Sequence, residues 1–212
     1  MEILMKKNSI IMVLLFILII SSNPVTGSSH QEPIPKPELP ILITSCGQSP
    51  GATMLKVIIS RLKLQHEPEV FELNALASAE DLIAKKEAGD PFKTIIIVMG
   101  ASLKGMGAAG ISIDDELDRT SALIKEAGEQ GITLIGAHIE GIKRRAQGAD
   151  VGDNTDELSI DAVAPFVDLL IINVEGNEDN RFTDISQEKN IPMIEVEKNI
   201  DLLNKLGDLF RQ

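Results

Sequence analysis

The stretch that begins at residue 41 constrains the fold more than any other part of the sequence. An isoleucine-rich apolar run starts at Ile41 and breaks at Gly47, after which Ser49 and Pro50 form a helix start signal. Apolar residues then recur at helical spacing, at Met54, Leu55, Ile58, Ile59 and Leu62. The stretch therefore predicts a strand, a turn and a helix as far as Leu64, which together open an alternating β/α chain.

The rest of the chain continues this alternation. The run Thr94–Met99 is apolar without interruption, which is typical of a central parallel strand covered on both faces. We expect further strands at 69–73, 132–137, 169–174 and 193–196, with helices at 78–87, 114–130, 157–167, 181–189 and 200–209. Residues 101–110 and 147–156 are expected to be loops, and 139–146 a short helical piece.

This order predicts a three-layer α/β sandwich around a mostly parallel sheet of about six strands, because strands separated by helices form right-handed crossovers. We prefer a Rossmann-like strand order, and a flavodoxin-like order is the alternative.

The N-terminus has the layout of a secretory signal peptide. Lys6 and Lys7 precede the apolar run Ile10–Ile20, and Val25 and Gly27 fit the small-residue positions of a cleavage site. The run is short for a membrane span, which needs about 20 residues. We therefore expect residues 1–27 to direct export to an extracytoplasmic location. An uncleaved leader that anchors the chain is the alternative, and would be its only contact with a membrane.

A linker and one domain follow. Residues 28–38 are rich in proline, which favours an extended chain, so we interpret them as a spacer. Residues 39–212 are expected to form a single α/β domain.

Composition excludes several classes of partner. The net charge of -12 argues against nucleic acid and against anionic membrane surfaces, which both need clustered positive charge. The chain has no Trp or Tyr, which disfavours a carbohydrate site. The one cysteine, Cys46, cannot form an internal disulfide. Oligomeric state is not indicated by the sequence.

Four motifs, in order, resemble an exported bacterial family of domains of unknown function: Thr44–Pro50, Gly105–Gly110, Gly136–His138 and Lys143–Arg145. The resemblance covers nearly all of Leu39–Gln212 and implies an extracytoplasmic α/β domain. It brings neither an assigned activity nor a catalytic residue. The acidic stretch Asp150–Asp156 is longer than the family pattern.

The carboxyl ends of the strands are the expected place for a ligand, since open parallel sheets bind ligands there, at the switch point of the strand order. Four polar segments converge on that edge: 46–51, 100–110, 138–145 and 175–181. The candidate ligand-binding residues are Ser45, Gln48, Ser49, Ser102, Lys104, Gly105, Gly107, His138, Arg144 and Arg145.

These candidate residues fit a small anionic metabolite best, and a partner in the cell envelope is a second hypothesis. Free N–H groups at the start of the first helix favour negative charge near Ser49. Lys104 and Arg144 or Arg145 can close over such an anion. The plainer interpretation is that these basic side chains are solvated or paired with Asp150, Asp153 and Asp156.

An extracytoplasmic hydrolase or transferase is the alternative function. Cys46 could be a thiolate at the helix start and His138 its base, and the two strands are neighbours if the order is Rossmann-like. The plainer interpretation is a small buried residue and a hydrogen-bonded histidine.

The sequence predicts no cofactor and no metal. Gly105, Gly107 and Gly110 match G-x-G-x-x-G, but this motif follows the third strand rather than the first, which disfavours a nicotinamide cofactor. The acidic stretch 150–157 has no calcium-loop spacing, and the histidines have no zinc spacing.

Overall fold

The computed structural model describes residues 33–64, 71–147 and 154–211. The predicted signal peptide and residues 28–32 of the linker lie outside this range, as does most of the acidic stretch. Among the described helices, none combines the length and the apolar character that a membrane crossing requires. Residue 38 is tied to the domain, because the Glu38 N–H donates to Thr94 Oγ1 at 2.9 Å.

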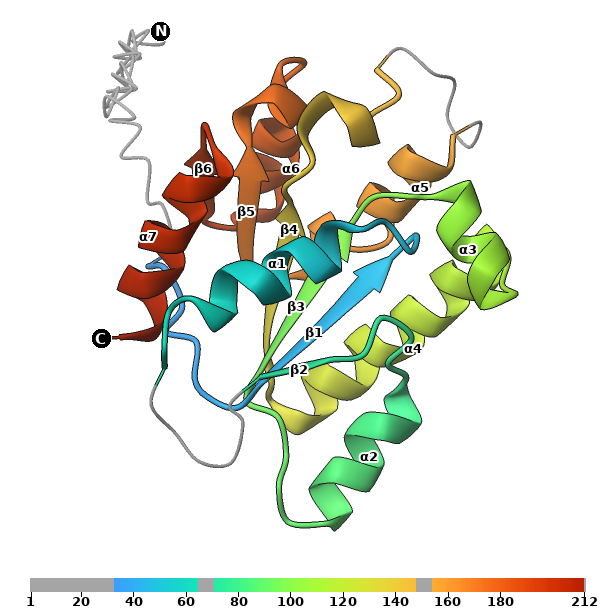
Figure 1. Ribbon diagram of the computed structural model, residues 1–212, viewed down its shortest axis with the longest axis vertical. Coiled ribbons are helices and arrows are strands. Elements are labelled where there is room, and N and C mark those ends of the chain that lie inside the picture. The colour runs from blue at the N-terminus through green and yellow to red at the C-terminus, as the bar shows by residue number, and fades with distance from the viewer. Residues whose placement is uncertain (1–32, 65–70, 148–153, 212) are drawn as a thin grey trace, which may run out of the picture. The chain divides into compact units, whose positions relative to one another are not determined.

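The sheet has six parallel strands in the order β2-β1-β3-β4-β5-β6 (Figure 1). The strands are β1 (Ile41–Cys46), β2 (Phe71–Leu73), β3 (Thr94–Met99), β4 (Thr133–His138), β5 (Leu169–Asn173) and β6 (Met193–Val196). The predicted α/β class is confirmed, but the preferred Rossmann-like order is wrong. The order is the flavodoxin-like alternative, because the chain adds β2 on one side of β1 and then β3 on the other. The switch point therefore lies between β1 and β3.

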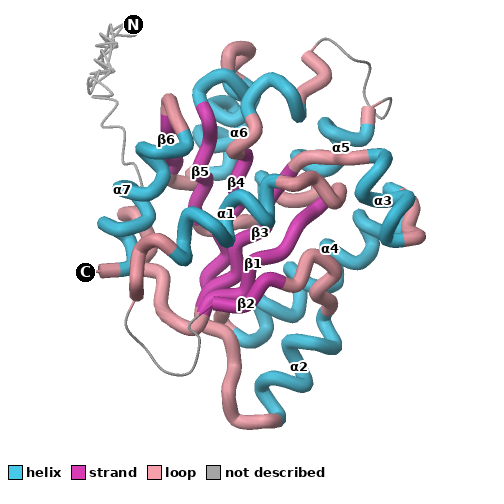
Figure 2. Tube along the Cα trace, viewed as in Figure 1, coloured by secondary structure: helices cyan, strands magenta, loops and turns pink. Residues whose placement is uncertain are grey.

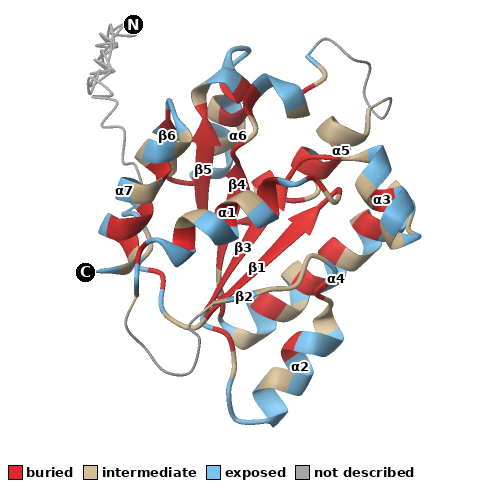
Figure 3. Ribbon diagram, viewed as in Figure 1, coloured by how far each residue is buried: buried red, intermediate tan, exposed pale blue. Residues whose placement is uncertain are grey.

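Helices cover both faces of the sheet (Figure 2). One layer consists of α1 (Gly51–Ser60) and α7 (Asn199–Phe210). The other contains α2 (Ala79–Glu87), α4 (Ile113–Gln130), α5 (Thr155–Asp161) and α6 (Arg181–Lys189). Alternate strand residues divide between the two cores, as Ile41 and Ile43 pack toward α1 while Leu42 packs toward α2 and α4. The strands β1, β3 and β5 are buried along their length, the edge strands β2 and β6 are only partly buried, and the helices are buried on their inner sides (Figure 3).

Residues 101–110, expected to be a loop, contain the helix α3 (Leu103–Ala109). Ser102 caps it, because its hydroxyl accepts the Gly105 N–H at 3.1 Å, and Gly110 ends it in the left-handed conformation. Gly105, one of the glycines that suggested a loop, is needed instead for close packing. A Cβ at position 105 would collide with the carbonyl oxygen of Gln48, so glycine allows α3 to pack directly on that backbone.

Three helix boundaries also differ from expectation. Ser112, rather than Asp114, caps α4, since its hydroxyl accepts the Asp115 N–H at 3.1 Å and the Asp115 carboxylate accepts the Ser112 N–H at 2.8 Å. The helix α1 ends at Ser60 rather than Leu64. The expected helix 157–167 divides into α5 and the 3-10 turn η2 (Ala164–Phe166), whose proline cannot continue an α-helix. Two further 3-10 turns, η1 (Gly141–Arg144) and η3 (Val174–Asn177), follow β4 and β5.

Candidate functional site

The loops that follow β1 and β3 are joined to each other at the switch point. Gln48 and Ala101 form an isolated antiparallel bridge, and the Ser102 N–H donates to the Gly47 carbonyl at 2.7 Å. The helix α3 continues from the second of these loops, beyond the carboxyl end of β1 (Figure 1). The backbone of this edge is thus fixed by hydrogen bonds between the two loops.

A carboxylate of the chain itself occupies the start of α1. Glu140 follows β4, and its Oε2 accepts the Gly51 N–H at 3.1 Å. Its Oε1 accepts Nε of Arg144, also at 3.1 Å. Glycine at position 51 leaves room for this contact, because a Cβ there would lie 2.8 Å from Oε2. A negative group therefore sits where the unpaired N–H groups and the helix dipole favour one.

Arg144 completes this cluster. Its Nη1 donates to the Ala101 carbonyl at 2.8 Å, and its side chain stays 24% exposed. A Cβ at Gly100 would lie 3.1 Å from Arg144 Cγ and 3.3 Å from Ser49 Oγ, so Arg144 and Ser49 border the same position. The structure thus brings together Ser49 and Arg144, two of the residues selected from the sequence.

Asp156 approaches the cluster from α5. Its Oδ1 accepts the Ala101 N–H at 2.7 Å. Burial raises the pKa of Asp156, and the Ala101 N–H and the charge of Arg144 only partly oppose this rise. Arg144 therefore lies near two acids: Glu140, with which it forms an ion pair, and Asp156, which ionises less readily.

Arg145, the next residue, points elsewhere. Its side chain is 1% exposed, with Nε 2.9 Å from Glu157 Oε1 and Nη2 2.6 Å from Asp179 Oδ2. Its Nη1 also donates to the Gly176 carbonyl, and the guanidinium lies 5.6 Å from the centre of the Phe182 ring. Arg145 therefore links η1 to α5 and η3 and is not part of the edge cluster.

Most of the remaining selected residues hold the backbone of the edge, but Lys104 and Gly107 do not. Gln48 Nε2 donates to the Ala75 carbonyl at 2.8 Å and to the buried Glu116, and Ser45 Oγ donates to the same carbonyl at 3.2 Å. Ser102 and Gly105 shape α3 as described above. Lys104 lies exposed in the first turn of α3, and the Cα of Gly107 faces open space.

Cys46 and His138 do not form a nucleophile–base pair. The strand β3 lies between theirs, so two strand spacings, roughly 10 Å, separate them. Both residues are fully buried. Burial raises the pKa of the Cys46 thiol to about 11, which keeps it protonated. Burial also lowers the pKa of His138, whose Nε2 donates to the Arg144 carbonyl at 3.0 Å.

The acidic stretch shows no calcium-like arrangement in its described part. Asp150 and Asp153 lie outside the described residues. Asp156 binds the Ala101 N–H, and Glu157 binds Arg145 and the Ala146 N–H at 2.8 Å. Both of these described carboxylates are therefore engaged by donors of the protein.

Glu140 is the site residue that the sequence reasoning missed. It precedes Arg144 by four residues, a spacing that lets opposite charges meet on a helical turn. Its position just beyond the end of β4, after Ile139, also places it at the edge where a ligand was expected. Those two signals together could have selected it.

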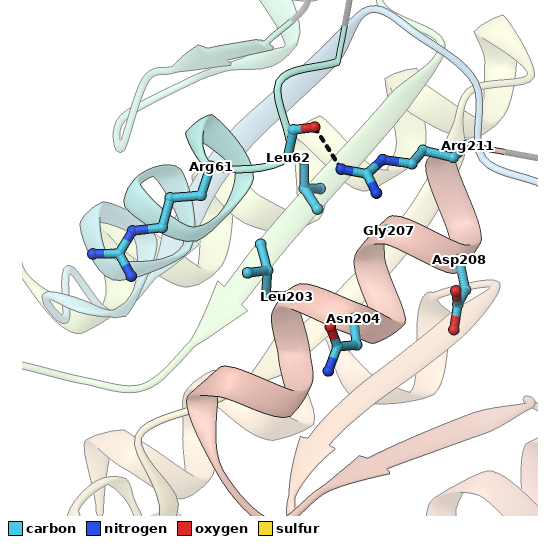
Figure 4. A pocket seen from close by; sticks show the side chains of 7 residues that line it. All are labelled: Arg61, Leu62, Leu203, Asn204, Gly207, Asp208 and Arg211. Atoms are coloured by element: carbon cyan, nitrogen blue, oxygen red, sulfur yellow. Dashed lines mark hydrogen bonds between the residues drawn. The ribbon is translucent and has the colours of Figure 1, made fainter.

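A separate cavity of about 710 Å³ lies between the end of α1 and α7. Figure 4 shows the side chains of Leu62 and Leu203 facing each other there, with Arg211 donating to the Leu62 carbonyl at 2.7 Å. Helices that follow parallel strands end at the edge where the strands begin. This cavity is therefore at the opposite edge from the Glu140 cluster.

Residues 38–210 match the family described as Domain of unknown function (DUF6305), and the chain belongs to this family. The resemblance to a family of unknown function is thereby confirmed. A search of curated proteins found no match.

Two similar solved structures are esterases. The psychrotrophic esterase EstA from Pseudoalteromonas sp. is 14% identical over 74% of this chain and 76% of its own, with a TM-score of 0.35. The acetyl xylan esterase AlAXEase is 12% identical over 79% of this chain and 83% of its own, with a TM-score of 0.34. TM-scores of this size carry no argument about activity.

Proposed function

We propose that this DUF6305 domain binds a small anionic group at the start of α1, between the carboxyl ends of β1 and β3. One observation carries the proposal: the carboxylate of Glu140 is held there by the Gly51 N–H and by Arg144, each at 3.1 Å. A position that accommodates a carboxylate of the protein has the donors that an external anion needs.

Binding would proceed by exchange. The incoming anion takes the place of the Glu140 carboxylate and accepts hydrogen bonds from Gly51 and Arg144, and Lys104 adds positive charge from α3. The Arg144 side chain is 24% exposed and that of Glu140 9%, so the incoming anion replaces the hydrogen bonds that the leaving carboxylate gives up. The Arg144 guanidinium stays oriented during exchange by the Ala101 carbonyl.

Glu140→Gln tests this proposal, because the amide keeps the shape of the side chain and removes its charge. We expect the variant to bind sulfate about fivefold more tightly than the wild type in calorimetric titrations, since the competing ion pair is gone. Adding Arg144→Gln should abolish the gain, and salt should weaken binding.

Two control variants define the outcome. Arg61→Gln changes an exposed arginine near the opposite edge and should leave the sulfate affinity unchanged, as should Cys46→Ala. Equal affinities in the wild type and Glu140→Gln would contradict the exchange of anions at α1.

We also propose that the domain works outside the cytoplasm, on the strength of the leader sequence. Mass spectrometry of the native N-terminus should find cleavage near Gly27, or an intact leader in the membrane fraction. Full-length protein in the soluble cytoplasmic fraction would contradict export.

A further inference from the structure

Phe166 is exposed in a chain that has very few aromatic residues. The sequence contains six Phe and no Trp or Tyr. Phe166, at the end of η2, is 60% exposed, while the other described phenylalanines are buried or half-buried. A large apolar side chain left in water gains nothing for folding, and an exposed apolar surface rimmed by polar residues marks an interaction site.

Phe166 does border a cavity. An open cleft of about 660 Å³ lies between η2 and α6, with Phe166, Pro165 and Ile185 as its apolar lining. This volume falls in the range of sites that hold small molecules or single large side chains. The cleft therefore offers an aromatic face and aliphatic walls to an occupant.

The charged lining of the cleft is acidic in excess. Its basic groups already have partners, as Lys189 pairs with Glu188 at 2.9 Å and Arg181 pairs with Asp161. Asp184 has no ion-pair partner among the residues that the structure describes. The lining carries four carboxylates, of which Asp161, Asp179 and Glu188 pair with Arg181, Arg145 and Lys189, so Asp184 is its uncompensated charge. The cleft therefore complements a positively charged occupant.

We propose that this cleft binds an arginine side chain on an extended segment of a partner protein. A guanidinium can stack on the Phe166 ring while it donates to the carboxylate of Asp184, and its planar shape suits both contacts. The aliphatic stem of the arginine packs on Pro165 and Ile185. The net charge of -12 attracts a basic partner over longer distances. The cleft lies on the α6 face, so this interaction is independent of the anion site at α1.

The test uses a capped hexapeptide with two arginines and the same peptide with citrulline, which has the same shape without the charge. Fluorescence polarisation should detect binding of the arginine peptide alone, and binding should weaken as salt is added. Phe166→Ala should weaken it about two- to fivefold, the size of an exposed cation–π contact. Asp184→Asn should weaken it to a similar extent.

Two matched variants separate a site from general attraction to an acidic protein. Ile200→Ala removes a side chain that is 59% exposed on α7, and Asp208→Asn removes an exposed charge on the same helix. The proposal requires both to bind like the wild type while Phe166→Ala and Asp184→Asn bind more weakly. Any other pattern overturns it, including equal losses in Asp184→Asn and Asp208→Asn.

Discussion

Arg144 and Arg145 are adjacent in the sequence and belong to two regions that are built differently. Arg144 lies at the edge of the sheet with its side chain 24% exposed, and its ion-pair partner is Glu140. Arg145 is 1% exposed and pairs with both Glu157 and Asp179. The first arrangement engages one carboxylate, whereas opening the second would take Asp179 and Glu157 from the guanidinium they share and leave Glu157 with its ion pair to Arg181, at 3.2 Å.

The acids that follow along the chain show the same division. Asp156 turns toward Ala101 in the edge region, and Glu157 turns toward Arg145. Burial raises the pKa of Asp156. Burial also acts to raise the pKa of Glu157, but hydrogen bonds from Arg145 and the Ala146 N–H and the charges of Arg145 and Arg181 bring it below its ordinary value. Asp156 and Glu157 are adjacent acids, but Asp156 belongs to the edge of the sheet and Glu157 to the ion pairs of Arg145.

The largest expected effect separates the two arginines by stability. Arg145→Gln should lower the free energy of unfolding by about 3 kcal/mol, because it leaves Glu157 and Asp179 without their shared partner. Arg144→Gln should lower it by less, about 1–2 kcal/mol, since it removes the partner of one carboxylate, Glu140, to which the Gly51 N–H still donates. Urea unfolding of both variants measures the difference. Losses of equal size would erase the distinction between the two regions.

A pair of glycines tests how the edge region is held together. Gly105→Ala should destabilise the domain by about 2 kcal/mol, because its Cβ would collide with the Gln48 carbonyl and displace α3. Gly107→Ala faces open space in the same helix and should stabilise by about 0.5 kcal/mol. Thermal unfolding compares the two. Should both behave alike, close backbone packing would not be what fixes this edge.

The secondary structure was largely readable from the sequence, for reasons that these elements illustrate. Thr94–Met99 is uniformly apolar because both faces of β3 are covered, and its predicted bounds are those observed. The order of the strands could not be predicted in the same way. An apolar strand sequence shows that both faces of the strand are buried, but it does not show which other strand is its neighbour in the sheet. The helix α3 was missed because Gly105 serves a contact with a distant backbone, and local propensity does not record such contacts.

The candidate site was readable only as a region. Polar loops after β1, β3 and β4 predicted the edge, and Ser49 and Arg144 do border one position there. Nothing in the sequence separates Arg144 from Arg145, because the direction of each side chain depends on the turn η1 and on acids from α5 and from the segment between η3 and α6. The Cys46–His138 hypothesis depended on the Rossmann-like order, and it lost its geometric basis when β3 was found between the two strands.

The acids provide a smaller effect, visible in the pH dependence. The folded pKa of Glu157 is depressed, so its stabilising contribution is present above the unfolded pKa and is lost as the pH falls through the folded value. The folded pKa of Asp156 is raised, so its ionisation opposes folding at neutral pH, and this penalty disappears as the pH falls below about 4. Carboxyl NMR titration should find the pKa of Asp156 above, and that of Glu157 below, the ordinary value for its residue type. In Arg145→Gln the pKa of Glu157 should rise while that of Asp156 changes little, and shifts in the opposite directions in the wild type would contradict the assignment of the two acids.

The most direct test of the central claim is an amide NMR titration of Glu140→Gln with sulfate. If the start of α1 is the anion site, the amide signals of Gly51 and Ala52 should shift most and saturate together, with the side-chain signal of Arg144 following them. The amides around Arg61 and Arg211, at the opposite edge, should not move. Shifts centred on Arg61 and Arg211, or shifts that grow without saturating at Gly51, would contradict the account.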